Sequence, residues 1–295
     1  MEGVMIRGKE YAVTAVRHPS GNIVTRSQKL NRIYTGFLRK TPFTRGIIVL
    51  IESLVLGYSS LSWSANVALE EEVKEGDEKK EGQPKQEISS AYTTIIMIVS
   101  FAFGIGLFFL LPLFLTNLAE PFIESSFIFH LVEGVIRLAI FLLYLKLISF
   151  MADIRRVFSY HGAEHKTINA YEHGVPLEAG EIQKYSTAHA RCGTAFLLSV
   201  MVLAILVFSL VGKQELWLMV TSRIVLLPVI AAIGYEVTQF GARHMKNPLT
   251  RALITPGLWL QGLTTGQPDD SQVEVAVVAL KEVLKQEEGK ATQPA

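Results

Sequence analysis

Two long stretches of the chain carry no charged residue. Residues 92–116 and 193–212 run for 25 and 20 positions without Asp, Glu, Lys or Arg. As helices, both are long enough to cross a hydrocarbon core of about 30 Å. Residues 127–150 and 216–241 are also strongly apolar but contain a few charges. We interpret all four segments as transmembrane helices.

A fifth apolar segment, residues 46–65, is interrupted by Glu52 and several serines. Loop 117–126 has no Lys or Arg, whereas loop 151–192 has five. The positive-inside rule therefore places loop 151–192 in the cytoplasm, together with the strongly basic N-terminus and the linker before the first span. Segment 46–65 then begins and ends on the same side. We expect it to be re-entrant or interfacial, in a membrane protein with both termini cytoplasmic.

The parts outside the apolar segments are varied. Residues 11–17 and 23–25 are β-prone and flank turn-forming residues 18–22, a pattern typical of a hairpin. Residues 70–87 contain eight acids and four lysines with almost no apolar residue, which indicates a solvated, flexible linker. These features divide the chain into seven parts. They are a β-hairpin element (1–45), a re-entrant or interfacial helix (46–65), an acidic linker (66–91), two spans (92–152), a cytoplasmic insert (153–192), two further spans (193–241) and a C-terminal region (242–295).

The C-terminal region has two parts. Residues 250–265 mix Pro, Gly, Leu and Trp259, as interfacial segments do. A helix is expected to start at Ser271, with Glu274 completing a capping box. Its apolar residues fall on one stripe, which we expect to dock on the protein's own cytoplasmic module: Val273, Val277, Leu280 and Leu284.

The fold class is therefore an all-α integral membrane protein, with four transmembrane helices, one re-entrant or interfacial helix and a small cytoplasmic module that includes the N-terminal β-hairpin. The formal net charge of +1 predicts no nucleic-acid partner. Residues 1–45 alone carry nine Lys or Arg against two acids. The single cysteine excludes an internal disulfide.

The cytoplasmic insert carries the candidate chemistry. Residues 153–173 have no proline and one glycine, so we expect a helix that continues the second span and ends near Gly174. His161 and His165 would share one face of it, which suits a divalent metal, and Glu164 would act as general base. His-x-x-Glu-His is also the inverted zinc-protease pattern, although five-residue patterns recur by chance.

A second polar cluster precedes the third span, so both clusters should meet at one membrane surface. It contains His189 and Cys192, which we count with His161 and His165 as metal ligands; Glu172 could replace one of them. Zinc is the expected ion, with iron, nickel and copper left open. The alternative is a polar collar, because membrane interfaces favour such side chains.

Charges also occur inside the spans. Glu133 and Arg137 are four residues apart, and Arg223 is expected at the same depth in the fourth span, where it could pair with Glu133. Glu236 lies near the inner end of the fourth span and could face the cytoplasmic cluster.

Four motifs, in order, carry a resemblance: EGVMIRG (2–8), YHGAEHKT (160–167), HARCGT (189–194) and LTTGQPDD (263–270). They resemble the YqhQ family of bacterial membrane proteins, whose function is unknown and which is loosely described as metal-dependent enzymes. The resemblance covers nearly the whole chain apart from the 70–90 linker. It implies that His161, Glu164, His165, His189 and Cys192 are family-motif positions. Ala190 departs from the proline usual in the family.

The function expected from the residues is metal binding in the inner membrane, with metal-dependent hydrolysis at the cytoplasmic face. One alternative is a non-enzymatic scaffold or membrane-protein biogenesis factor. A second is a small transporter in which the intramembrane charges line a path. Membrane lipid is an expected partner, and a protein partner could bind residues 1–45 or the C-terminal helix.

Overall fold

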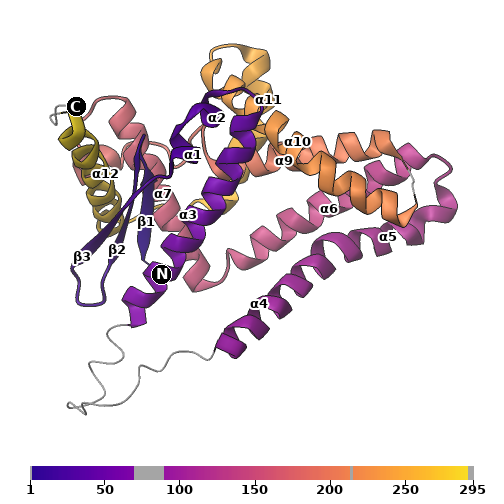
Figure 1. Ribbon diagram of the computed structural model, residues 1–295, viewed down its shortest axis with the longest axis horizontal. Coiled ribbons are helices and arrows are strands. Elements are labelled where there is room, and N and C mark those ends of the chain that lie inside the picture. The colour runs from indigo at the N-terminus through magenta and orange to yellow at the C-terminus, as the bar shows by residue number, and fades with distance from the viewer. Residues whose placement is uncertain (1, 70–89, 213–214, 292–295) are drawn as a thin grey trace.

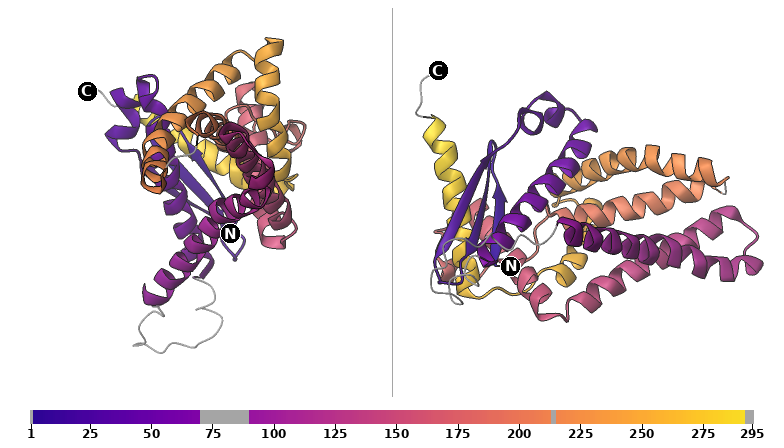
Figure 2. Two further views of the ribbon diagram at one scale, coloured as in Figure 1. Left: turned by 90° about the vertical axis from the view of Figure 1, so that its right-hand side faces the viewer. Right: turned by 60° about the horizontal axis from the view of Figure 1, so that its bottom comes forward.

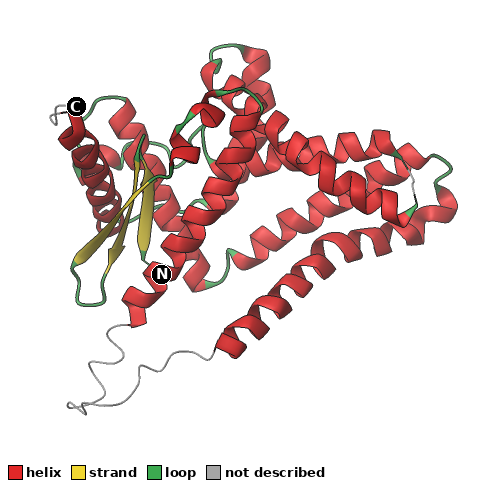
Figure 3. Ribbon diagram, in the orientation of Figure 1, coloured by secondary structure: helices red, strands yellow, loops and turns green. Residues whose placement is uncertain are grey.

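The computed structural model describes residues 2–69, 90–212 and 215–291. A small β-sheet and its covering helices form one end of the molecule, and long apolar helices extend from it to the other side (Figure 1). Figure 3 shows that the strands are confined to the first end. The predicted acidic linker at 66–91 lies mostly outside the described residues, apart from its ends, which belong to helices α3 and α4.

The sheet is antiparallel, with strand order β1-β2-β3. Its strands are β1 (Gly3–Arg7), β2 (Tyr11–Arg17) and β3 (Ile23–Lys29). The predicted hairpin at 18–22 is confirmed, and Gly21 adopts the positive φ (89°) that its turn requires. Strand β1 was not predicted. It pairs with β2 along its whole length, so the hairpin element is a three-stranded sheet.

One face of the sheet is covered by helices α12 (Asp270–Ala291) and α7 (Ala152–Glu172). Val273, Val277 and Leu280 are buried in the shared core, so the predicted docking of the apolar stripe is confirmed. The predicted capping box is wrong. Asp269, not Ser271, caps α12, accepting from the Gln272 N–H at 2.9 Å while the Gln272 side chain accepts from the Asp269 N–H.

Among the described residues, four helical segments are long and apolar enough to cross a membrane by length and composition, and a bent pair makes a fifth if it is one span. The four are Thr44–Ala68, Ile98–Phe122, Gly193–Val211 and Val220–Arg243. The second consists of α4 (Ser90–Ile105), a π-helical turn (Gly106–Leu110) and α5 (Leu111–Ala119), followed by the 3-10 turn Glu120–Phe122. The last two are α9 (Gly193–Val211) and α10 (Leu216–Arg243).

The bent pair consists of α6 (Ser126–Ile148) and α7, which meet at 100°. The expectation that α7 continues the second span is therefore wrong. The helix breaks at 149–151 because α7 packs on α12 and the sheet, across the direction of α6. The predicted end of α7 is confirmed, since Gly174 follows it with φ of 69°.

The charges inside the apolar helices do meet. Glu133 forms an ion pair with Arg137 and lies 3.7 Å from the guanidinium of Arg223, as their matching depths predicted. His130 adds a hydrogen bond of 3.2 Å to the same carboxylate. Arg137 also donates to the carbonyl oxygen of Phe108 in the π-helical turn. The cluster thus joins three helical segments.

Helix α3 (Thr44–Leu69) runs at a steep angle to the long apolar helices and lies between them and the sheet, as Figures 1 and 2 both show. Its polar face contacts the N-terminal region. Glu52 pairs with Arg7 and Arg39, and Ser60 lies 2.9 Å from the Thr14 hydroxyl. The short helices α1 (Arg32–Thr35) and α2 (Phe37–Lys40) connect the sheet to α3.

The expectation that Glu236 faces the cytoplasmic cluster is wrong. Its carboxylate pairs with Arg45 at the start of α3 and accepts a hydrogen bond from the Phe43 N–H. Helix α10 then leads into α11 (Pro248–Thr264), the segment predicted as interfacial, which packs beside the start of α9 and ends next to α7.

Candidate metal centre

Three of the predicted ligands come together where α7 meets the start of α9. His161 and His165 lie one turn apart on α7, and Cys192 is the residue that caps α9. One ligand atom from each lies within 4.8 Å of the other two. The Cys192 sulfur is 3.3 Å from Nε2 of His161. His165 and Cys192 are buried, with 4% and 7% of their surface exposed.

Both histidines are held through their other ring nitrogen. Nδ1 of His161 is 2.9 Å from the Thr264 carbonyl oxygen, and Nδ1 of His165 is 2.6 Å from that of Thr187. A carbonyl only accepts, so each Nδ1 carries a proton, and Nε2 is the ring atom that can bind a metal when the ring is neutral. Metal-binding histidines in proteins are oriented by the same kind of hydrogen bond.

The loop that precedes Cys192 is hydrogen-bonded to side chains of α7. The Lys166 ammonium donates to the Gln183 carbonyl at 2.7 Å. The Asn169 amide donates to the carbonyls of Ser186 and Ala188. These hydrogen bonds pair backbone carbonyl groups that an irregular loop would otherwise leave without a partner. They also fix the path of the chain between helices α8 (Ala179–Ile182) and α9.

Gln261 on α11 also holds this loop, through hydrogen bonds to the backbone of His189. Its side chain is fully buried, accepts from the His189 N–H at 2.8 Å and donates to the His189 carbonyl at 3.0 Å. Our reading of the sequence did not single out Gln261. Its position in an otherwise apolar, interfacial-looking segment was the available signal, because a polar side chain buried there needs a partner.

Segment 264–266 lies directly against α7. A Cβ at Gly162 would overlap the Gly266 carbonyl oxygen, and the Gly266 N–H donates to the Phe158 carbonyl at 2.7 Å. This close approach brings the Thr264 carbonyl within reach of His161. The glycine inside the predicted metal helix is thus explained by backbone packing.

The thiol and the imidazole of the cluster perturb each other. Burial raises the pKa of the Cys192 thiol, but hydrogen bonds with His161 and His165 outweigh it and lower the pKa to about 5. Burial similarly lowers the pKa of His161, but the hydrogen bond and charge of Cys192 raise it to about 9. At neutral pH the two groups therefore form a thiolate–imidazolium pair.

Glu164 adjoins this group without belonging to it. Burial raises the pKa of its carboxyl, and the charges of His161 and His165 oppose that shift. Enzymes raise the pKa of carboxyl groups by burial where these serve as general acids or bases.

His189 also lies beside the three residues that come together. Its ring centroid is 5.8 Å from that of His165, but its Nε2 is 3.4 Å from a carboxylate oxygen of Glu172. Glu172 in turn pairs with Arg191. The two remaining ligand candidates thus bind each other at the edge of the cluster.

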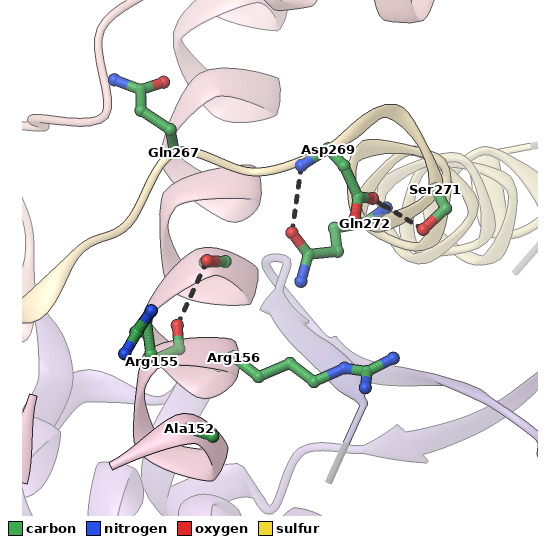
Figure 4. Close-up of a pocket in the computed structure, with 8 residues that line it drawn as sticks. Ala152, Arg155, Arg156, Gln267, Asp269, Ser271 and Gln272 are labelled. Carbon is green, nitrogen blue, oxygen red and sulfur yellow. Dashed lines mark hydrogen bonds between the residues drawn. The ribbon is translucent and has the colours of Figure 1, made fainter. Parts of the chain in front are cut away.

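A cavity of about 330 Å³ lies on another face of α7. Figure 4 shows Arg155 and Arg156 extending from α7 and Asp269 and Gln272 from the start of α12. Ser159, which also lines it, is two residues from His161, about 200° around the helix. The cavity therefore does not open onto the histidines.

The fold and the cluster define a mostly helical protein, with apolar helices of membrane-spanning length and a small sheet-containing module. A His-His-Cys group lies where the two meet. The family described as protein of unknown function (DUF1385) matches residues 41–286, and the chain belongs to it. It is also 37% identical to the uncharacterized protein YqhQ of Bacillus subtilis (strain 168), over 97% of this chain and 91% of that protein. The resemblance to the YqhQ family is thereby confirmed. No solved structure matches the chain.

Proposed function

We propose that the protein is a multi-pass protein of the bacterial cytoplasmic membrane, with four spans formed by α4–α5, α6, α9 and α10. These helices project from one end of the molecule (Figure 2). Large apolar side chains are exposed along their length. Exposure on this scale would be unfavourable in water and is favourable in lipid. The distribution of Lys and Arg places the sheet, α7 and α12 in the cytoplasm.

Helix α3 then lies along the cytoplasmic surface instead of crossing the bilayer. Its polar face binds the sheet, and a span at this position would draw the Glu52 ion pairs and the sheet into hydrocarbon. Its opposite face exposes apolar side chains to the proposed lipid surface: Ile51, Leu54, Val55, Tyr58 and Leu61. This arrangement is that of an interfacial amphipathic helix.

At this surface, His161, His165 and Cys192 hold a divalent metal ion, and zinc suits them best. Tetrahedral zinc with Zn–N near 2.0 Å and Zn–S near 2.3 Å separates the nitrogen and sulfur atoms by about 3.5 Å. The observed separation of 3.3 Å between His161 and Cys192 supports such a site. The thiolate form of Cys192 is also the form that binds metals.

Three protein ligands are typical of catalytic zinc, which keeps one position open. A zinc ion held there supplies the Lewis acidity for hydrolysis. Glu164 follows His161 by three residues and precedes His165 by one, so it is placed beside the centre to accept a proton. The geometry therefore supports a metal-dependent hydrolase best, and the single observation that carries it is the three-ligand cluster.

The alternative is a structural metal centre in a non-enzymatic scaffold. The depth of His165 and Cys192 favours it, because buried ligands restrict access by substrate. In that case the metal joins α7 to α9, and Glu164 serves no chemical step.

The first experiment is elemental analysis of the detergent-purified full chain. We expect about one equivalent of zinc in the wild type and loss of it in His161→Ala/His165→Ala. A matched double variant, His173→Ala/His244→Ala, removes two histidines outside the cluster and should keep the metal. Metal-free wild type after reconstitution with zinc would refute the centre.

Glu164→Gln separates the two functions. A hydrolase predicts a variant that keeps its zinc but does not rescue the phenotype of a strain lacking the gene. Full rescue by a zinc-loaded Glu164→Gln protein would exclude the catalytic role and favour the structural centre.

A further inference from the structure

A groove of about 480 Å³ lies where α10 leads into α11. Its lining is mostly apolar: Glu236, Val237, Phe240, Gly241, Leu249 and Thr250. Phe240 and Leu249 are 60% and 79% exposed, so the groove lies open at the surface. It is separate from the candidate metal centre, where the far end of α11 contacts His161 through the Thr264 carbonyl.

Basic residues adjoin the groove lining along the chain. Arg243 and Lys246 follow the α10 side of its lining, and Arg251 follows the α11 side; all three are exposed. The chain has no Asp or Glu between positions 237 and 268. The one carboxylate in the lining, Glu236, is already paired with Arg45.

We propose that this groove binds one anionic phospholipid of the cytoplasmic leaflet, and this inference rests on the membrane topology proposed above. The groove lies at the inner end of α10, where phosphates of that leaflet are found. An acyl chain would lie against Phe240 and Leu249, and the phosphate would contact Lys246 and Arg251. Basic pockets on the cytoplasmic side of helix bundles bind anionic headgroups in this way.

Charge determines the class of lipid. With Glu236 neutralised by Arg45, the three remaining cations leave a net positive site. A zwitterionic headgroup gains little from such a site, because its ammonium group would face the same cations. A phosphatidylglycerol headgroup, with a single negative charge, is favoured. A protein segment as occupant would require an acidic apolar stretch and would show no preference among lipids.

The test is native mass spectrometry of the full chain in detergent, with phosphatidylglycerol or phosphatidylcholine of identical acyl chains added. We expect the wild type to prefer phosphatidylglycerol. In Lys246→Gln/Arg251→Gln the binding constant for phosphatidylglycerol should fall about 25-fold, at about fivefold for each cation near a lipid surface. Binding of phosphatidylcholine should stay unchanged.

A matched control, Lys29→Gln/Lys281→Gln, removes the same charge from the sheet and α12 and should keep the preference. Phe240→Ala/Leu249→Ala should weaken the binding of both lipids to the same extent. The proposal is overturned if the control loses as much affinity for phosphatidylglycerol as Lys246→Gln/Arg251→Gln does, or if that groove variant still prefers phosphatidylglycerol. It is also overturned if glycerol 3-phosphate binds the wild type as tightly as the lipid does.

Extraction of cell membranes at alkaline pH tests separately whether the chain is integrated in the membrane. Release of the wild-type chain without detergent would refute the membrane proposal itself. Wild-type chain that remains in the membrane but shows no lipid preference would refute the groove alone. Zinc content measured in the same samples shows whether the groove variants keep the rest of the structure.

Discussion

Gly162 offers the sharpest test of how the candidate metal centre is built. In Gly162→Ala, the new methyl group would overlap the Gly266 carbonyl oxygen. That neighbour is backbone, which cannot rotate away as a side chain can, so α7 and segment 264–266 must separate. The Thr264 carbonyl, which holds Nδ1 of His161, belongs to the same segment.

The expected loss can be worked out from opposing effects. Overpacking costs about 1–3 kcal/mol, and the rigid contact puts this site near the upper value. Replacing glycine by alanine inside a helix returns about 1 kcal/mol. The net loss of about 2 kcal/mol corresponds to an unfolding temperature lower by about 4–8 °C for a protein of this size. Releasing the partner of His161 should also weaken zinc binding at least about tenfold.

A thermal ramp with a thiol-reactive dye measures the first effect, because Cys192 is the only cysteine and is buried. Competition with a zinc chelator measures the second. Gly180→Ala is the control, since a Cβ there meets nothing within 4 Å. If Gly162→Ala matched wild type in both assays, the contact with Gly266 would not position the histidine and the reasoning would be refuted.

Three further predictions concern single groups. Because the pKa of Cys192 is lowered to about 5, the rate of its alkylation by iodoacetamide in zinc-free protein should rise with pH, with a midpoint near pH 5. His161→Ala should move that midpoint to higher pH. An unchanged midpoint would contradict the thiolate–imidazolium pair. Glu52→Gln should lower the free energy of unfolding by about 1–3 kcal/mol, because Arg7 loses its buried carboxylate partner; urea unfolding of the purified chain measures it, and a change near zero would show that the pair is not needed. Lys166→Met should leave the Gln183 carbonyl unpaired and expose loop 183–192 to protease; wild-type resistance to cleavage would argue against this anchor.

Several elements could be predicted because their signal is local. Helix length and apolar content identify the long segments, since each spans enough residues by itself. The pairing of Glu133 with Arg223 followed from counting residues inward from the outer ends of two helices that run in the same direction, and the ion contact confirms it. The docking stripe on α12 followed from spacing of three and four residues.

Other elements depended on neighbours far along the chain. Strand β1 alternates as a strand should, with Val4 and Ile6 buried, but only its pairing with β2 distinguishes five such residues from a loop. The break between α6 and α7 has no proline or glycine to mark it. Its direction follows from α7 packing on α12, more than 100 residues away.

The candidate site shows the same division. The sequence by itself determined that His161, His165 and Glu164 share a short stretch of helix, because four-residue spacing places the histidines on one face whatever surrounds them. It could not choose among Cys192, His189 and Glu172 for the third position. The tertiary structure made that choice: Gln261 and Asn169 fix the loop, which places the Cys192 sulfur at His161 and turns His189 to Glu172. The physical reason is that helix spacing is set by local backbone geometry, whereas the path of a loop is set by hydrogen bonds to residues distant in sequence.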